Sequence, residues 1–234
     1  MIKNAIAVIP ARGGSKRIPK KNIKIFHGKP LIAYSIETAL QSDLFQKVIV
    51  STDCEEIANI SKKHGAQIPF LRPKELSDDF TGSGEAVDYT INRLKEQGEE
   101  YKYICTIYAT APFLNVSYLK KGYKEIIKDT ALQAFSCASM PYPVQRTFKI
   151  DQNGRCKMFW PEYFDKRSQD LEEAYHDAGQ FYWTNSTFIS NKKGFNEDMI
   201  PIVMPRHLVQ DIDTMEDWVN AELKYKILKE ANYV

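Results

Sequence analysis

The segment that most constrains this chain lies near its start, where an apolar run passes straight into a basic loop. Residues 5–9 are continuously apolar, which is typical of a parallel strand covered by helices on both faces. The next residues include two adjacent glycines, Gly13 and Gly14. Ligands of open α/β sheets bind at the carboxyl ends of the strands. The sequence therefore predicts a ligand-binding loop directly after a first core strand.

The loop has the chemistry that a triphosphate requires. Adjacent glycines let backbone N–H groups approach a phosphate closely. Guanidinium and ammonium groups bind phosphate oxygens, and the loop carries five such cations within ten residues: Arg12, Lys16, Arg17, Lys20 and Lys21. It is neither a Walker A motif nor GxGxxG, because the Gly-Lys-Ser/Thr ending and the third glycine are missing. The alternative is a basic surface turn, but the position after the first strand favours nucleotide binding.

The first half of the chain alternates apolar patterns of helix and strand. Asp53 and Glu56 have the spacing of a capping box, and Gly65 is the residue expected just beyond the end of that helix. This alternation predicts a doubly wound, mostly parallel sheet in one α/β domain spanning residues 1–234. We expect strands over 5–9, 48–51, 68–71, 103–108 and 134–139, and helices over 30–42, 53–64, about 87–94 and 116–128.

The alternation breaks at residue 140. Asn153-Gly154 is a strong hairpin signal between two short strand-like runs. A single hairpin is marginally stable in water, so we interpret 140–180 as an excursion from the domain that serves dimerisation or closes the ligand site. Beyond it we expect strands over 179–189 and 202–204 and an amphipathic helix over 215–230, with Trp218, Ala221 and Tyr225 on one side.

Two aspartates precede that last helix. In an extended segment, residues two apart point the same way, so Asp211 and Asp213 share a side. Mg²⁺ prefers oxygen ligands and usually binds one or two carboxylates together with substrate phosphates. The pair therefore predicts a Mg²⁺ site if the loop binds a triphosphate. The alternative is helix capping, for which Thr214 and Asp217 have the right spacing.

Composition excludes several classes of protein. Lys plus Arg is 32 and Asp plus Glu is 30, a net charge of +2, which lacks the basic excess of a nucleic-acid-coating protein. No apolar run approaches the ~18 residues that span a bilayer, and the first is too short for a signal peptide. Four cysteines without CxxC spacing favour a reducing cytoplasm. The sequence contains no motif typical of covalent catalysis. The residues leave open whether His176 takes part in the chemistry or has a structural role.

Blocks of the sequence resemble those of the CMP-sugar-acid synthetases, which activate sialic acid and its relatives. The blocks at 9–16, 51–53, 71–76 and 211–214 occur in that family's order and spacing, so the resemblance covers nearly the whole chain. The resemblance implies a Rossmann-like fold of the nucleotide-diphospho-sugar transferase type. It also implies a homodimer that uses CTP and Mg²⁺ in cell-surface glycan biosynthesis, flagellin glycosylation included. In that chemistry a sugar hydroxyl attacks the α-phosphate of CTP, and pyrophosphate leaves.

The resemblance also implies roles for individual residues. Catalysis is assigned to Lys21, Arg12 and Asp211, with Lys21 placed to stabilise developing charge, and the metal to Asp211 and Asp213. The sugar acid is expected to face Tyr108, Arg146, Arg167, Gln180 and Tyr182. The expected CTP contacts are Arg12, Gly13, Gly14, Ser15, Lys16, Lys21 and Asn22, with Arg72 and Ser83 near the cytidine.

One departure from the family bears on the sugar. Sialic acid synthetases carry glutamine where this chain has Tyr108, and Pro-Thr-Ser-Pro where it has 109–112. Residues 108–113, 167–183 and 205–207 instead resemble the branch that uses pseudaminic acid, a deoxy sugar with methyl groups that aromatic side chains suit. The alternatives are a cytidylyltransferase for sialic acid or an eight-carbon sugar acid, or a non-catalytic nucleotide-binding module.

Overall fold

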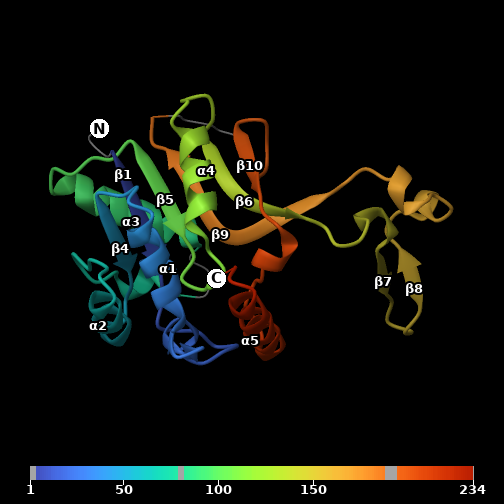
Figure 1. The fold of residues 1–234 in the computed structure, drawn as a ribbon, viewed down its shortest axis with the longest axis horizontal. Helices are drawn as coiled ribbons and strands as arrows, with labels where there is room; N and C mark the ends of the chain where they lie inside the picture. The colour runs from blue at the N-terminus through green and yellow to red at the C-terminus, as the bar shows by residue number, and fades with distance from the viewer. Residues whose placement is uncertain (1–3, 79–81, 188–193, 234) are drawn as a thin grey trace.

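The computed structural model describes residues 4–78, 82–187 and 194–233. Its centre is a six-stranded sheet in the order β10-β6-β9-β5-β1-β4, with helices on both faces (Figure 1). The strands are β1 (Ala5–Pro10), β4 (Lys47–Ser51), β5 (Tyr103–Ile107), β6 (Gln133–Ser139), β9 (Tyr175–Asn185) and β10 (Met199–Val203). The helices are α1 (Leu31–Gln41), α2 (Glu55–Lys63), α3 (Ser83–Glu96), α4 (Val116–Ile126) and α5 (Met215–Glu230).

The sheet is mostly parallel, as predicted. β1 runs parallel to β4 and β5, and β10 runs parallel to β6. Alternate residues of β1 enter two separate apolar clusters: Ala7 and Ile9 pack on the side of α1, α4 and α5, whereas Ile6 and Val8 pack on the side of α3. The continuous apolar run of β1 is therefore explained by burial on both faces.

β9 is the exception, because it runs antiparallel to both β5 and β6. The register between β6 and β9 passes from Phe135–Tyr182 to Cys137–Asp177, so one residue of β6 faces four of β9. Ser136 supports this bulge, since its Oγ accepts from the backbone N–H groups of Gln180 and Phe181 at 3.2 and 3.1 Å. The bulge re-aims the strand toward the excursion, which is a common use of such irregularities.

Several local predictions are confirmed. α2 is followed by Gly65 at φ +94°, where glycine relieves the strain of a left-handed backbone. Thr214 and Asp217 form the capping box of α5, with both side chain–backbone hydrogen bonds present. Trp218, Ala221 and Tyr225 are buried. However, α5 is not simply amphipathic, because its other side exposes Met215, Val219, Leu223 and Ile227.

Two local predictions are wrong, and one falls partly outside the described residues. Residues 68–71 form no strand, since only Gln67 makes an isolated bridge to Ile49. Asp53 does not cap α2: Cys54 is the N-cap residue, and no side chain accepts a hydrogen bond there. The expected strand over 179–189 is part of β9, but residues 188–193 lie outside the described ranges.

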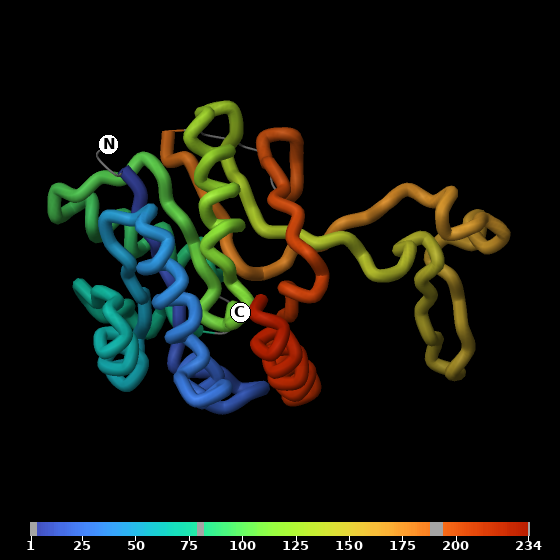
Figure 2. Tube along the Cα trace, in the orientation of Figure 1, coloured from blue at the N-terminus to red at the C-terminus, as the bar shows by residue number. Residues whose placement is uncertain are grey.

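The excursion forms a lobe, defined here as residues 140–174, that projects from the body on a two-stranded arm (Figures 1 and 2). Its hairpin pairs β7 (Phe148–Ile150) with β8 (Cys156–Met158), and Gly154 in the turn has φ +74°. The hairpin prediction is confirmed. No residue of the lobe is buried, so the lobe has no apolar core of its own. Among the described residues, no helix is long and apolar enough to cross a membrane.

Candidate active site

A cleft of about 440 Å³ lies at the carboxyl end of β1. The loop after β1 forms one wall, and the start of α3 forms another. Its lining includes most of the residues assigned to CTP: Arg12, Ser15, Lys16, Lys21, Asn22, Arg72 and Ser83. It also includes Tyr108, assigned to the sugar acid, and Asp213, assigned to the metal. Segments that are far apart in the sequence thus bring the predicted nucleotide residues together in one place.

The loop is held in shape by hydrogen bonds to its neighbours. The N–H of Ala11 donates to the carbonyl of Ser51 at 2.9 Å. Asn22 is buried, and its side-chain amide donates to the carbonyl of Arg12 at 3.0 Å. The N–H of Gly13 donates to Oδ1 of Asp53 at 2.9 Å. The loop therefore has a defined path before any ligand arrives.

The two glycines of the loop occupy different surroundings. A Cβ on Gly13 would lie 3.0 Å from Cβ of Cys54, whereas a Cβ on Gly14 would meet no described atom within 4 Å. Gly13 is thus needed for close packing against the start of α2. Gly14 instead faces open space, where the absence of a side chain leaves the backbone accessible to a ligand.

Arg72 is a buried cation in the wall of the cleft. Only 5% of it is exposed, and its Nε donates to Oγ of Ser77 at 2.9 Å. Burial is the main cause of a lowered pKa, against which the nearby charge of Asp53 acts, while Arg12 lowers the pKa further. A bound anion would offset the cost of keeping this guanidinium charged out of water.

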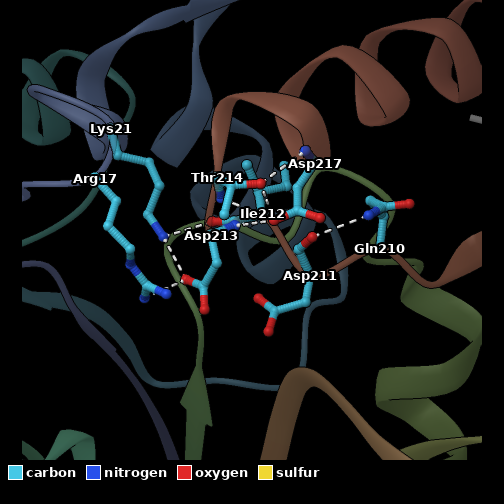
Figure 3. A network of polar contacts seen from close by, with 8 residues as sticks. All are labelled: Arg17, Lys21, Gln210, Asp211, Ile212, Asp213, Thr214 and Asp217. Carbon is cyan, nitrogen blue, oxygen red and sulfur yellow. Dashed lines mark hydrogen bonds and ion pairs between the residues drawn. The ribbon is translucent and has the colours of Figure 1, made fainter. Parts of the chain in front are cut away.

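Asp213 is held by two cations of the loop (Figure 3). Its Oδ1 lies 3.2 Å from Nζ of Lys21 and 2.9 Å from Nη2 of Arg17. Lys21 also donates to the carbonyl of Ile212 at 2.5 Å. This network joins the loop after β1 to the segment before α5, so the cations of the loop and Asp213 lie at one place in the fold.

Asp211 points to the same side as Asp213 (Figure 3), as the two-residue spacing predicts. Its carboxylate lies outside the residues that line the cleft. Partial desolvation raises the pKa of Asp211, and the negative charge of Asp213 raises it further. Within the described ranges, no three or more His, Cys, Asp or Glu side chains gather into a metal site. A cation held by this pair would need further ligands from the substrate.

The capping alternative does not compete with the aspartate pair. The capping box uses the side chains of Thr214 and Asp217, while Asp213 contributes only its backbone N–H, which donates to Asp217 at 3.1 Å. Helix capping and the proposed metal role thus fall on different side chains of the same motif.

The residues assigned to the sugar acid separate into two groups. Tyr108 lines the cleft, with its hydroxyl 3.1 Å from Oγ of Ser83. Tyr182 packs behind it with ring centroids 5.3 Å apart, and its hydroxyl donates to Asp177 at 2.6 Å. Gln180 is buried beside them, where its Nε2 donates to the carbonyl of Leu208 at 2.6 Å and its Oε1 has no partner among the described residues.

Arg146 and Arg167 form the second group, which lies in the lobe. Arg146 donates to the carbonyl of Lys166, and Arg167 pairs with Asp170 at 2.6 Å. Both are exposed, and the lobe extends away from the body (Figure 1). A single chain therefore does not bring these two arginines to its own cleft. His176 is exposed and does not line the cleft either.

Sequence patterns do not single out the contacts that Asp53 and Arg17 make in the structure. Asp53 has the spacing of a helix cap, although it lies in the 51–53 block that resembles the family. Arg17 is one of five loop cations, and its pattern does not single it out. The capping-box spacing of Asp53 and Glu56 is the same whether the Asp53 carboxylate caps α2 or contacts the loop. Only the fold separates the two interpretations.

Comparison with known proteins shows the family to which this chain belongs. Residues 6–197 match the family model described as Cytidylyltransferase. A pseudaminic acid cytidylyltransferase of Campylobacter jejuni is 45% identical, over 97% of this chain and 99% of its own length. CMP-N,N'-diacetyllegionaminic acid synthase of Legionella pneumophila is 31% identical, over 97% and 98%.

The solved structures that match are more distant in sequence and support the fold alone. A CMP:2-keto-3-deoxy-manno-octonic acid synthetase complexed with CTP has a TM-score of 0.68 at 15% identity, covering 97% of this chain and 99% of that one. The 4-diphosphocytidyl-2C-methyl-D-erythritol synthase of Anaerococcus prevotii has a TM-score of 0.60 at 14% identity, covering 95% and 98%. Both agree with an α/β fold of the nucleotide-diphospho-sugar transferase type.

Proposed function

This chain belongs to the cytidylyltransferase family, and on that premise we propose that it transfers CMP from CTP to a nonulosonic acid, pseudaminic acid, with release of pyrophosphate. The observation that carries the proposal is the single cleft that joins the basic loop after β1 to Asp213. The identity of 45% to a pseudaminic acid cytidylyltransferase over almost the full length of both chains supports the choice of substrate.

The loop provides the binding site for the triphosphate. Gly14 leaves space for a phosphate next to the backbone, and four cations of the loop line the cleft: Arg12, Lys16, Arg17 and Lys21. Arg72 and Ser83 line the cleft with them, which supports their assignment to the cytidine end of CTP. A triphosphate in this position would give Arg72 the anion that its buried guanidinium favours.

Catalysis in this scheme is an in-line displacement at the α-phosphate. The oxygen of the sugar hydroxyl forms the new bond to the α-phosphorus and its proton passes to solvent. The bond from the α-phosphorus to the bridging oxygen breaks, and pyrophosphate leaves with that oxygen and the electron pair. Lys21 is mostly buried, with 17% of its side chain exposed. A positive charge fixed there would stabilise the extra negative charge of the transition state more than that of bound CTP. Arg12 lines the same cleft and would bind the phosphates.

Mg²⁺ fits the donor set at Asp211 and Asp213. Two carboxylates on one side of an extended segment, of which Asp213 lines the cleft, are the kind of ligands that Mg²⁺ prefers. When bound, Mg²⁺ supplies charge neutralisation and alignment of the phosphates. Arg17 and Lys21 both contact Asp213. Phosphates that bind these two cations would leave the Asp213 carboxylate free to hold the metal.

The protein acts as a homodimer in this proposal. The lobe has no buried residue and exposes several large apolar side chains: Tyr142, Phe148, Ile150, Phe159, Trp160 and Phe164. Exposed apolar patches of this kind mark association surfaces. Since Arg146 and Arg167 lie far from their own cleft, their assigned role in sugar binding requires the lobe of a second copy. The four free cysteines are compatible with the reducing cytoplasm in which we place the reaction.

The function is tested by following the product with each nucleotide. Purified protein is incubated with Mg²⁺, pseudaminic acid and CTP, UTP, ATP or GTP, and the mixtures are analysed by mass spectrometry. We expect CMP-pseudaminic acid and pyrophosphate from CTP and at most traces of product from the other nucleotides. CTP binding without any nucleotide-sugar product would point to the non-catalytic module instead.

A further inference from the structure

Asp53 lies where a helix cap is expected but serves the nucleotide loop. It immediately precedes Cys54, the N-cap residue of α2, and α2 begins without a side-chain cap. The carboxylate instead accepts the N–H of Gly13 at 2.9 Å, a contact between residues 40 positions apart. A good capping residue is thus used to hold a loop rather than to stabilise its own helix.

This hydrogen bond decides which amides remain for a phosphate. A carboxylate is a strong acceptor for a backbone N–H, so the N–H of Gly13 is already satisfied in the free protein. The backbone amides that can turn to a ligand are those that follow Gly13. The first is that of Gly14, where an added Cβ would meet no described atom within 4 Å. Asp53 therefore sets both the path of the loop and the position at which phosphate binding begins.

Asp53 also belongs to a segment that organises both ends of the cleft. The carbonyl of Ser51 accepts from Ala11 at 2.9 Å on the side of the loop. The carbonyl of Thr52 accepts from the backbone N–H of Arg72 at 2.8 Å on the other side. Through residues 51–53, the end of β4 aligns the phosphate loop with the buried guanidinium of Arg72.

We propose that Asp53 is a positioning residue for triphosphate binding, which fixes Gly13 so that Gly14 and the residues after it receive the phosphates. The proposal rests on the proposed use of CTP. It gives Asp53 no contact with substrate: Asp53 acts through the backbone of the loop, in addition to its charge interaction with Arg72. The carboxylate of Asp53, just after β4, is then a part of the active site that supports the ligand-binding loop without touching the ligand.

The direct test is amide hydrogen exchange of the wild-type protein, measured by NMR with and without CTP. We expect the Gly13 amide to be protected in the free protein, and the Gly14 and Ser15 amides to gain protection only when CTP binds. Rapid exchange at Gly13 in the free protein, with protection gained only on CTP binding, would overturn the proposal. If CTP causes no change anywhere, the proposed function fails, while the protection of Gly13 still tests the contact.

Substitutions provide the second test. Asp53→Ala removes the acceptor, and we expect it to weaken the binding of CTP and of pyrophosphate at least tenfold by calorimetry while cytidine binding changes less than twofold. Asp53→Asn keeps an oxygen that can accept the Gly13 N–H, and should restore most of the pyrophosphate affinity. An equal loss of cytidine affinity, or no rescue by asparagine, would indicate a general structural role and contradict the proposal.

Glu56→Gln is the matched control. Glu56 lies in the first turn of α2 and pairs with Lys20 of the same loop at 2.6 Å, but both side chains are at least half exposed. Exposed ion pairs contribute little, so pyrophosphate affinity should change less than twofold. If Glu56→Gln weakens pyrophosphate binding as much as Asp53→Ala does, general tethering of the loop to α2 determines the affinity, and the hydrogen bond from Gly13 to Asp53 has no special role.

Discussion

Lys21 and Asp213 are separated by almost the whole chain, yet their side chains meet at 3.2 Å in the cleft. One belongs to the loop after β1, and the other to the segment that leads into α5. Their contact brings the basic loop and one member of the aspartate pair to the same place. The proposed phosphate-binding and metal-binding roles can act on one substrate only because of that juxtaposition.

Lys21→Ala should lower kcat more than it raises KM for CTP. A fixed charge that acts chiefly on the transition state affects the rate rather than ground-state binding. Arg12→Ala is the comparison, because its loss should weaken the use of CTP itself. Steady-state kinetics of both variants provide the measurement. An effect of Lys21→Ala confined to KM would remove its catalytic role.

Asp211→Asn and Asp213→Asn should each lower turnover at saturating Mg²⁺ by at least about 10²-fold, or about 2.7 kcal/mol of activation free energy, if the pair holds the metal. Both variants keep the size of the side chain and leave the Thr214–Asp217 capping box intact, so thermal stability should change little. Near wild-type rates for both would show that the aspartates are not metal ligands.

The raised pKa of Asp211 would give the proposed metal site a pH dependence. A carboxylate must lose its proton to bind a cation, so Mn²⁺ affinity should fall as pH drops through the raised pKa of Asp211. Besides burial, the groups that act on Asp211 are Asp213 and Asp217, which raise the pKa, and Lys21 and the backbone of Ile212, which lower it. Asp217→Asn removes a carboxylate that raises this pKa and leaves both proposed ligands in place. It should therefore move this transition to lower pH, as measured by electron paramagnetic resonance of bound Mn²⁺.

The two glycines of the loop should respond differently to substitution. Gly14→Val should abolish CTP binding, measured by calorimetry, while leaving the melting temperature nearly unchanged, because no described atom lies within 4 Å of its Cβ. Gly13→Ala places a Cβ 3.0 Å from Cβ of Cys54, and crowding of this kind typically costs about 1–3 kcal/mol of folding free energy. Equal melting temperatures for Gly13→Ala and Gly14→Ala would contradict this distinction.

The lobe should control association. Sedimentation at micromolar concentration should show a dimer for the intact chain, and deletion of 148–158 should give a monomer or an aggregate. A milder variant, Phe148→Ser with Ile150→Ser, replaces two exposed apolar side chains of β7 and should weaken the dimer without unfolding the body. A stable monomer for the intact chain would rule out the dimer.

The sequence predicted the parts of the molecule whose signals are local. Apolar periodicity located the strands and helices of the body, and Asn153-Gly154 located the hairpin. Residues 68–71 look like a strand by composition, but only Gln67 bridges to β4, because pairing depends on neighbours that periodicity does not describe. Likewise, β9 is antiparallel and carries a bulge supported by Ser136, which a βαβ pattern does not reveal.

The site was predictable where residues share one segment, and less so where they are assembled by the fold. The cations of the loop and the aspartate pair each have a readable pattern. That Asp53 binds Gly13 instead of capping α2, and that Arg17 pairs with Asp213, depends on how the loop folds back. Arg146 and Arg167 remain assignments from resemblance, since one chain holds them outside its cleft.

The proposed activity and its substrate are tested most directly by measuring pyrophosphate release from CTP with pseudaminic acid, sialic acid and the eight-carbon acid in parallel, under identical Mg²⁺. A site built to match one set of polar groups rejects analogues that leave those groups unpaired. We expect turnover with pseudaminic acid, and a kcat/KM at least about 10²-fold lower, or about 2.7 kcal/mol, for the other two. A preference for sialic acid would contradict the substrate assignment, and release with none of the three would contradict the cytidylyltransferase activity itself.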